Sequence, residues 1–91
     1  MAKKTAEAFL FTAAQRALPR DDGAFELRDA ILDGAGADKI LMNERMVRIA
    51  LRVLVILEDT SESLEEVRQA RAMITDLRER LARMQIDQMG H

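Results

Sequence analysis

The sequence predicts an all-α fold, a small helical bundle of about four helices in a single domain over residues 1–91. Two features of the composition favour helices. Good helix formers such as Ala, Leu, Arg, Glu and Met dominate, and 4 Gly and 1 Pro are fewer turn residues than most all-β folds need. The third feature is the spacing of the apolar residues, which recur every three or four positions in four segments.

The first two helices are expected at about residues 5–18 and 24–33. In the first helix, mostly small apolar residues follow the i, i+3, i+4 spacing of one face, and Phe11 and Leu18 form a second ridge beside it. The composition of Pro19–Gly23 predicts a turn between the two helices. Two glycines after the second helix favour a break rather than a phosphate-binding loop, because the spacing of such a loop is absent.

The third helix is expected to begin near Asp38 or Asn43 and to end around Asp59, at about residues 39–58, and it includes the apolar stretch RMVRIALRVLVILED, residues 45–59. The run VLVIL inside it is also compatible with a buried strand. Arg45, Arg48 and Arg52 decide between the two, because their spacing aligns them on one side of a helix but on both faces of a strand. Apolar residues cover more than half of this helix, so we expect neighbours on at least two of its sides.

The fourth helix is expected at about residues 64–85, with a frayed tail at 86–91. Ser63 and Glu66 have the spacing of a capping box at its start. Its apolar residues form a heptad seam that is typical of coiled coils. The seam consists of Val67, Ala70, Ile74, Leu77, Leu81 and Met84.

We expect the third and fourth helices to form a long antiparallel hairpin with a short capped loop. The seam of the fourth helix covers one face of the third, and the two N-terminal helices or a second copy of the chain cover the other face. The prediction favours the second copy, that is, a homodimer in which two hairpins complete a four-helix bundle. The expected interface residues are Phe11, Leu18, Met46, Ala50, Leu54, Leu57 and Met73.

The sequence offers little for catalysis or for metal binding. It has no Cys, and its single His is the last residue, His91, whose origin the sequence leaves open. The Ser and Thr residues of the loop before the fourth helix have no neighbouring base, and the paired Asp residues fit turns and caps better than a calcium loop. We therefore predict a protein that is not an enzyme, with no catalytic residue, no cofactor and no metal.

The charge and the apolar runs bear on the location of the protein. The net charge of −2 and the pI near 5.4 give no overall attraction to nucleic acid or to anionic membranes. The longest unbroken apolar run is far shorter than the roughly 20 residues that span a bilayer. Lys3 and Lys4 imitate the start of a signal peptide, but Glu7 interrupts the apolar region that should follow. We expect a cytoplasmic protein without membrane contact.

Arginine is the unusual excess, with 11 of the 14 basic residues. Arg45, Arg48, Arg52, Arg71 and Arg78 are candidate contacts for anions or for an acidic partner. The expected function is that of a protein–protein interaction module, an adaptor, inhibitor or chaperone-like protein that presents helical surfaces. The alternative is a nucleic-acid-associated transcriptional regulator, for which the second and third segments would serve as a helix-turn-helix. The partner cannot be named from the sequence.

Overall fold

The computed structural model describes residues 6–89, and they contain five α-helices and no strand. The helices are α1 (Ala6–Ala17), α2 (Gly23–Leu32), α3 (Ala37–Ile40), α4 (Glu44–Thr60) and α5 (Leu64–Met89). The all-α prediction is confirmed for this part of the chain. Lys3, Lys4 and His91 lie outside the described residues.

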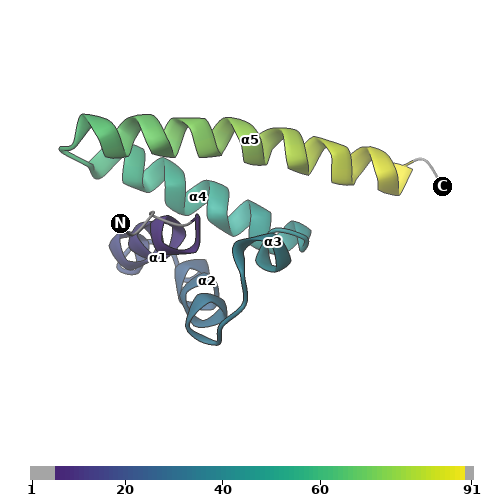
Figure 1. The fold of residues 1–91 in the computed structure, drawn as a ribbon, viewed down its shortest axis with the longest axis horizontal. Helices are drawn as coiled ribbons and strands as arrows, with labels where there is room; N and C mark the ends of the chain where they lie inside the picture. Colours follow the sequence, from purple (N-terminus) through teal and green to yellow (C-terminus); the bar gives the residue numbers. More distant parts are fainter. Residues whose placement is uncertain (1–5, 90–91) are drawn as a thin grey trace, which may run out of the picture.

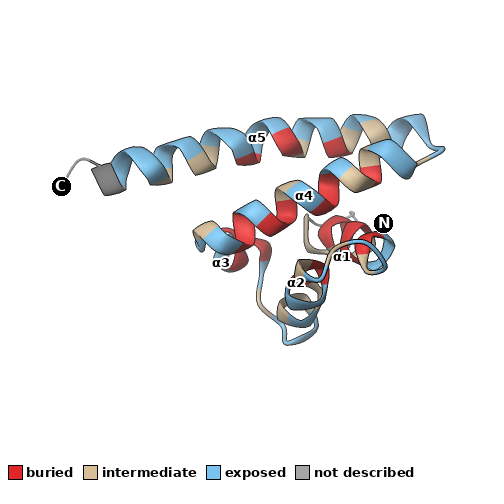
Figure 2. Cartoon of the chain, turned by 180° about the vertical axis from the view of Figure 1, so that it is seen from behind, coloured by how far each residue is buried: buried red, intermediate tan, exposed pale blue. Residues whose placement is uncertain are grey.

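Helix α4 occupies the centre of the molecule (Figure 1). Helix α5 packs along one side of it, and α1 and α2 pack on the other side. Buried residues occur along α4, on α1 and on the part of α5 that faces α4 (Figure 2). The buried side chains of α4 are Met46, Val47, Ile49, Ala50, Val53, Leu54 and Leu57. The wide apolar surface of this helix is thus covered by other helices of the same chain.

Small side chains let α1 lie close to its neighbours. Ala13, Ala14 and Ala17 are completely buried, as is Leu10 beside them. With only a methyl group at three core positions, α1 approaches both α2 and α4. The N-terminal pair of helices therefore forms the layer that closes the core on this side of α4.

The chain breaks after α2 because Gly34 adopts a positive φ of 92°. The N–H of Gly34 donates to the carbonyl of Ile31 at 3.0 Å, and the N–H of Ala35 donates to the carbonyl of Ala30 at 3.2 Å. These two hydrogen bonds form a Schellman motif, which ends a helix with a residue in the left-handed region. The expected break at the glycines is therefore present.

The third predicted helix is divided in two, which raises the number of helices from about four to five. Asn43 has an extended backbone, with φ −97° and ψ 122°, and its side-chain oxygen accepts a hydrogen bond from the N–H of Met46 at 3.2 Å. An N-cap of this kind starts a new helix. Of the two starts expected for the third helix, Asp38 and Asn43, the second is the one at which α4 begins, after α3 has ended.

Helices α4 and α5 are joined by a short loop, residues 61–63, and run in opposite directions (Figure 1). The N–H of Glu66 donates to Oγ of Ser63 at 3.3 Å, which is one half of the predicted capping box. The Glu66 carboxylate does not complete the box: it accepts a hydrogen bond from Oγ of Ser61 at 2.6 Å and from Nη1 of Arg16 at 3.0 Å. The loop is thereby tied to α1 as well as to α5.

Helix α5 continues to Met89, past the expected end at residue 85. No Gly or Pro occurs between Leu64 and Met89, so no residue interrupts the helix. The last turns of α5 extend beyond the other helices (Figure 1). Among the described residues, no helix combines the length and the apolar character that crossing a membrane requires.

Candidate interaction surface

Four of the residues predicted at an interface lie in the core instead. Ala50, Leu54 and Leu57 are completely buried, and Met46 is 8% exposed. Helices α1, α2 and α5 of the same chain cover the sides of α4 that carry them. These four side chains therefore cannot contact a second copy in this fold, and their assignment to an interface is corrected.

The other three predicted interface residues, Phe11, Leu18 and Met73, are half-buried. Leu18 and Met73 pack against the edge of the core. None of the three is among the large apolar side chains that the described part of the chain leaves exposed.

Most of the predicted anion contacts are engaged in ion pairs within the chain. The pairs are Arg45 with Glu26 at 2.9 Å, Arg48 with Glu44 at 2.8 Å, Arg52 with Asp21 at 2.8 Å, and Arg71 with Glu58. Two of them tie α4 to α2 and to the turn before α2, so the Arg stripe of α4 holds helices together. Arg78 has no ion pair within the described residues.

The Arg52–Asp21 pair shifts the pKa of both of its members. Two nitrogens of Arg52 donate to the two carboxylate oxygens of Asp21, at 2.8 and 3.3 Å, and the N–H of Gly23 donates to the same carboxylate at 2.9 Å. The hydrogen bonds from Arg52 lower the pKa of Asp21 against the opposing effect of burial. The same bonds raise the pKa of Arg52.

An exposed apolar surface does exist on α4, at positions other than those predicted. Leu51 and Ile56 are half-buried and Val55 is 45% exposed; we name these three residues the α4 strip. All three residues of the strip line one open hollow, and Val55 and Ile56 also line a second hollow beside it. The charged residues around the hollows are Arg20, Asp21, Arg52, Glu58, Asp59, Arg71 and Arg78.

The signal for the α4 strip was present in the sequence. Val55 follows Leu51 by four positions and Arg52 by three, so these side chains share one side of the helix. Apolar residues that fall among the charged residues of a helix are those that the core leaves out. The predicted interface residues of α4 were taken from its widest apolar face, and that face is the one that the core buries.

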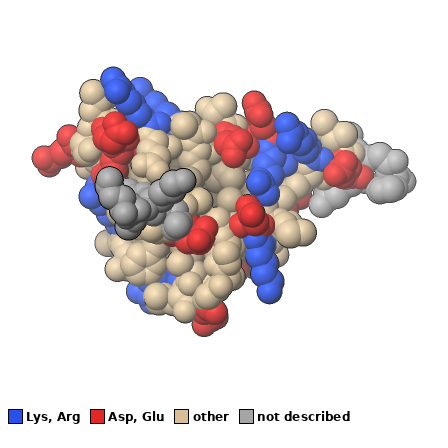
Figure 3. Space-filling model, viewed as in Figure 1, with Lys and Arg blue, Asp and Glu red and all other residues tan. Residues whose placement is uncertain are grey.

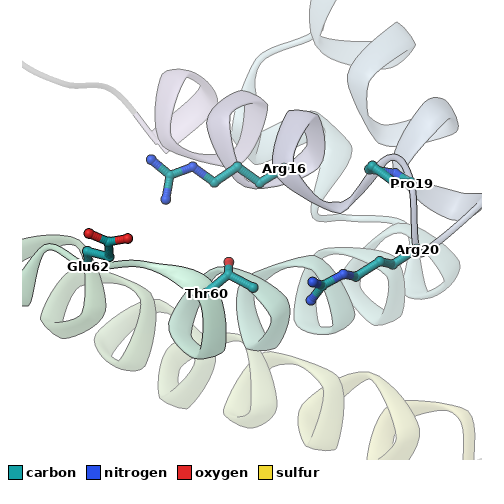
Figure 4. Close-up of a pocket in the computed structure, with 5 residues that line it drawn as sticks. All are labelled: Arg16, Pro19, Arg20, Thr60 and Glu62. Carbon is teal, nitrogen blue, oxygen red and sulfur yellow. The ribbon is translucent and has the colours of Figure 1, made fainter.

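A third hollow lies where the end of α1 approaches the end of α4 (Figure 4). Figure 4 shows Arg16 and Arg20 reaching from the α1 side toward Thr60 and Glu62. Arg16 is already paired with Glu66 at 3.0 Å, and the Thr60 hydroxyl donates to the carbonyl of Ile56 at 2.8 Å. The Glu62 carboxylate also lines this hollow, so the hollow is poorly suited to binding an anion.

The rest of the described surface also exposes large apolar side chains, namely Phe25, Leu32, Met42, Leu64 and Ile86. Acidic and basic side chains interleave over the face seen in Figure 3. No group of three or more His, Cys, Asp or Glu side chains that could hold a metal ion occurs in residues that the structure describes. The segment considered as a helix-turn-helix leads into α3, which has only 4 residues and buries Ala37 and Ile40.

Comparisons with known proteins add no relative: no protein-family model, curated protein or solved structure matches the chain.

Proposed function

We propose that this chain is an interaction module without catalytic activity, an adaptor, inhibitor or chaperone-like protein that binds another protein through the α4 strip. One observation carries the proposal: the chain covers both sides of its central helix by itself and still leaves Val55 45% exposed between Leu51 and Ile56. Apolar residues surrounded by polar and charged ones are the usual composition of a protein-binding surface.

The structure of α4 changes the argument for a homodimer. That prediction rested on a second apolar face of residues 45–59 that only another copy could cover. Helices α1 and α2 cover this face, so a second copy is not required to complete the core. We therefore propose a different protein as the occupant of the α4 strip.

The alternative function, regulation through nucleic acid, has less support. Four of the five candidate Arg residues are paired with carboxylates of the same chain. A phosphate would have to compete with these carboxylates. Purified protein is expected to leave duplex DNA unshifted in gel electrophoresis at low salt, where non-specific binding is strongest. A shift that disappears with added salt would favour the alternative.

Photo-crosslinking in the native cell tests the proposed function. A photoreactive amino acid replaces Val55 in one variant and Ala72, an exposed residue of α5, in the control. We expect position 55 to form a crosslink to a distinct protein and position 72 to form none to that protein. Equal crosslinking at the two positions, or none at position 55, contradicts the proposal.

A further inference from the structure

We infer that the occupant of the α4 strip is an acidic amphipathic helix of the partner protein. The inference rests on the proposed function and adds the chemistry of the partner. The α4 strip offers one turn of apolar surface, since Leu51 and Val55 are four residues apart and thus about 6 Å along the helix. We name the four arginines around it, Arg20, Arg52, Arg71 and Arg78, the Arg rim.

The charge of this surface favours an acidic partner. Arg52 and Arg71 are already paired with Asp21 and Glu58, so the positive charge that a partner meets is that of the other two arginines of the rim. Arg20 and Arg78 have no ion pair within the described residues.

Of the carboxylates that line the two hollows, only that of Asp59 has no ion pair within the described residues. The surface therefore has an excess of positive charge, although the whole chain has a net charge of −2.

The form of the partner follows from what the α4 strip lacks. An extended peptide gains affinity by adding a strand to an open sheet edge, and the described residues contain no strand. A proline-rich peptide docks between aromatic side chains, and the α4 strip has none. An amphipathic helix needs only an apolar hollow for side chains spaced three and four apart. Its polar flanks then lie against the Arg rim, which selects Asp and Glu there.

Other occupants fit this surface less well. In a two-fold dimer the same patch faces itself, so the excess of Arg on one copy would oppose that on the other. A lipid bilayer is bound by a helix with a long apolar face, whereas the α4 strip has three residues, two of them half-buried. Single-stranded nucleic acid binds by stacking on aromatic side chains, which the lining of the hollows lacks.

A displayed peptide library tests the inference. The library presents 18-residue helices with a fixed Leu stripe at i, i+3, i+4 and i+7, and with flanking positions randomised among Glu, Gln and Lys. Selection against the purified protein is expected to enrich Glu at the flanks. We expect Val55→Gln to weaken the enriched peptides about ten-fold and Arg78→Gln to weaken them about two- to five-fold.

Arg83→Gln is the matched control, because Arg83 is exposed on the same helix, has no ion pair with any described residue and lies outside the two hollows. It should leave the affinity unchanged. Enrichment of Gln or Lys, no enrichment, or binding that ignores Val55→Gln overturns the inference. Self-association that Val55→Gln abolishes, or sedimentation with phosphatidylserine vesicles that it abolishes, also overturns it. If the peptide selection fails in one of the first three ways but position 55 still crosslinks to a distinct protein, the inference about the partner is wrong and the proposed function stands.

Discussion

Arg52 and Asp21 form a two-point ion pair that ties the middle of α4 to the turn between α1 and α2. Nε of Arg52 lies 2.8 Å from one carboxylate oxygen of Asp21, and Nη2 lies 3.3 Å from the other. The Asp21 side chain is only 13% exposed, whereas that of Arg52 is 53% exposed. The pair joins residues 31 positions apart in the sequence and therefore helps to position the N-terminal layer on α4.

The pair predicts a loss of stability in acid. The pKa of Asp21 is lowered in the folded chain from its ordinary value of 3.8, so the unfolded chain binds more protons in this range. The contribution of the pair is complete above pH 3.8 and declines as the pH falls from there through the lower pKa of the folded state.

Asp21→Asn should reduce this acid dependence and lower the free energy of unfolding at neutral pH by about 0.2–1 kcal/mol. Urea unfolding between pH 2 and pH 7 measures both effects. Asp59→Asn is the control, since Asp59 is exposed and without an ion pair in the described chain. Identical pH profiles for Asp21→Asn and the unaltered protein would contradict the prediction.

Gly23→Ala should disturb the same ion pair while leaving both of its residues unsubstituted. A Cβ atom at position 23 would lie 2.7 Å from Nη2 of Arg52, 3.1 Å from Oδ1 of Asp21 and 3.1 Å from Cγ1 of Ile49. The guanidinium is the end of a flexible side chain and will move away. The pKa of Asp21 should then rise toward its ordinary value, which an NMR titration of the carboxyl carbon detects.

Gly36→Ala is the control for this prediction, because a Cβ there would meet no atom within 4 Å. It should leave the titration of Asp21 unchanged. An Asp21 pKa that stays low in Gly23→Ala would show that the guanidinium keeps its place beside the added methyl group.

Sequence patterns predicted the helices well where one physical signal dominated. The spacing of Arg45, Arg48 and Arg52 identified a helix within an apolar run, and the glycines identified the break after α2. The sequence leaves the start of α4 open between Asp38 and Asn43, because that start depends on one side chain. Asn43 can occupy a helix or cap one, and only the hydrogen bond to Met46 settles which.

The site was harder to predict than the fold, since its residues are defined by tertiary contacts. The sequence placed the Arg residues on one side of α4, but it gave no sign that Glu26 and Asp21 would lie opposite Arg45 and Arg52. It also could not decide between α1 and a second copy as the cover of Leu54. Both layers are apolar, so the choice depends on packing in three dimensions.

Asn43→Ala should destabilise the protein by about 0.5–2 kcal/mol, because the N–H of Met46 loses its side-chain acceptor at the start of α4. Asn43→Gly should cost only a few tenths of a kcal/mol, since Gly is tolerated at an N-cap. Met42→Ala is the control, as Met42 is 74% exposed. Thermal unfolding followed by circular dichroism gives the order of the three variants, and a cost for Met42→Ala equal to that for Asn43→Ala would refute the capping role.

Leu54 and Val55 are adjacent, and their environments predict opposite behaviour. Leu54 is completely buried between the layers, so Leu54→Ala should cost about 2–5 kcal/mol through the cavity it leaves. Val55 is 45% exposed, and Val55→Ala should stay within about 1 kcal/mol of the unaltered protein. Chemical denaturation measures both differences.

Leu54→Arg distinguishes a core location of Leu54 from a location at a dimer interface. If Leu54 were at a dimer contact, this variant would be a folded monomer with its helices intact. Since the side chain is enclosed by helices of its own chain, the guanidinium would be buried without a partner, and the expected result is an unfolded protein. Circular dichroism together with sedimentation distinguishes the two. A helical monomer derived from a dimer would mean that the helices around Leu54 belong to two chains rather than to one.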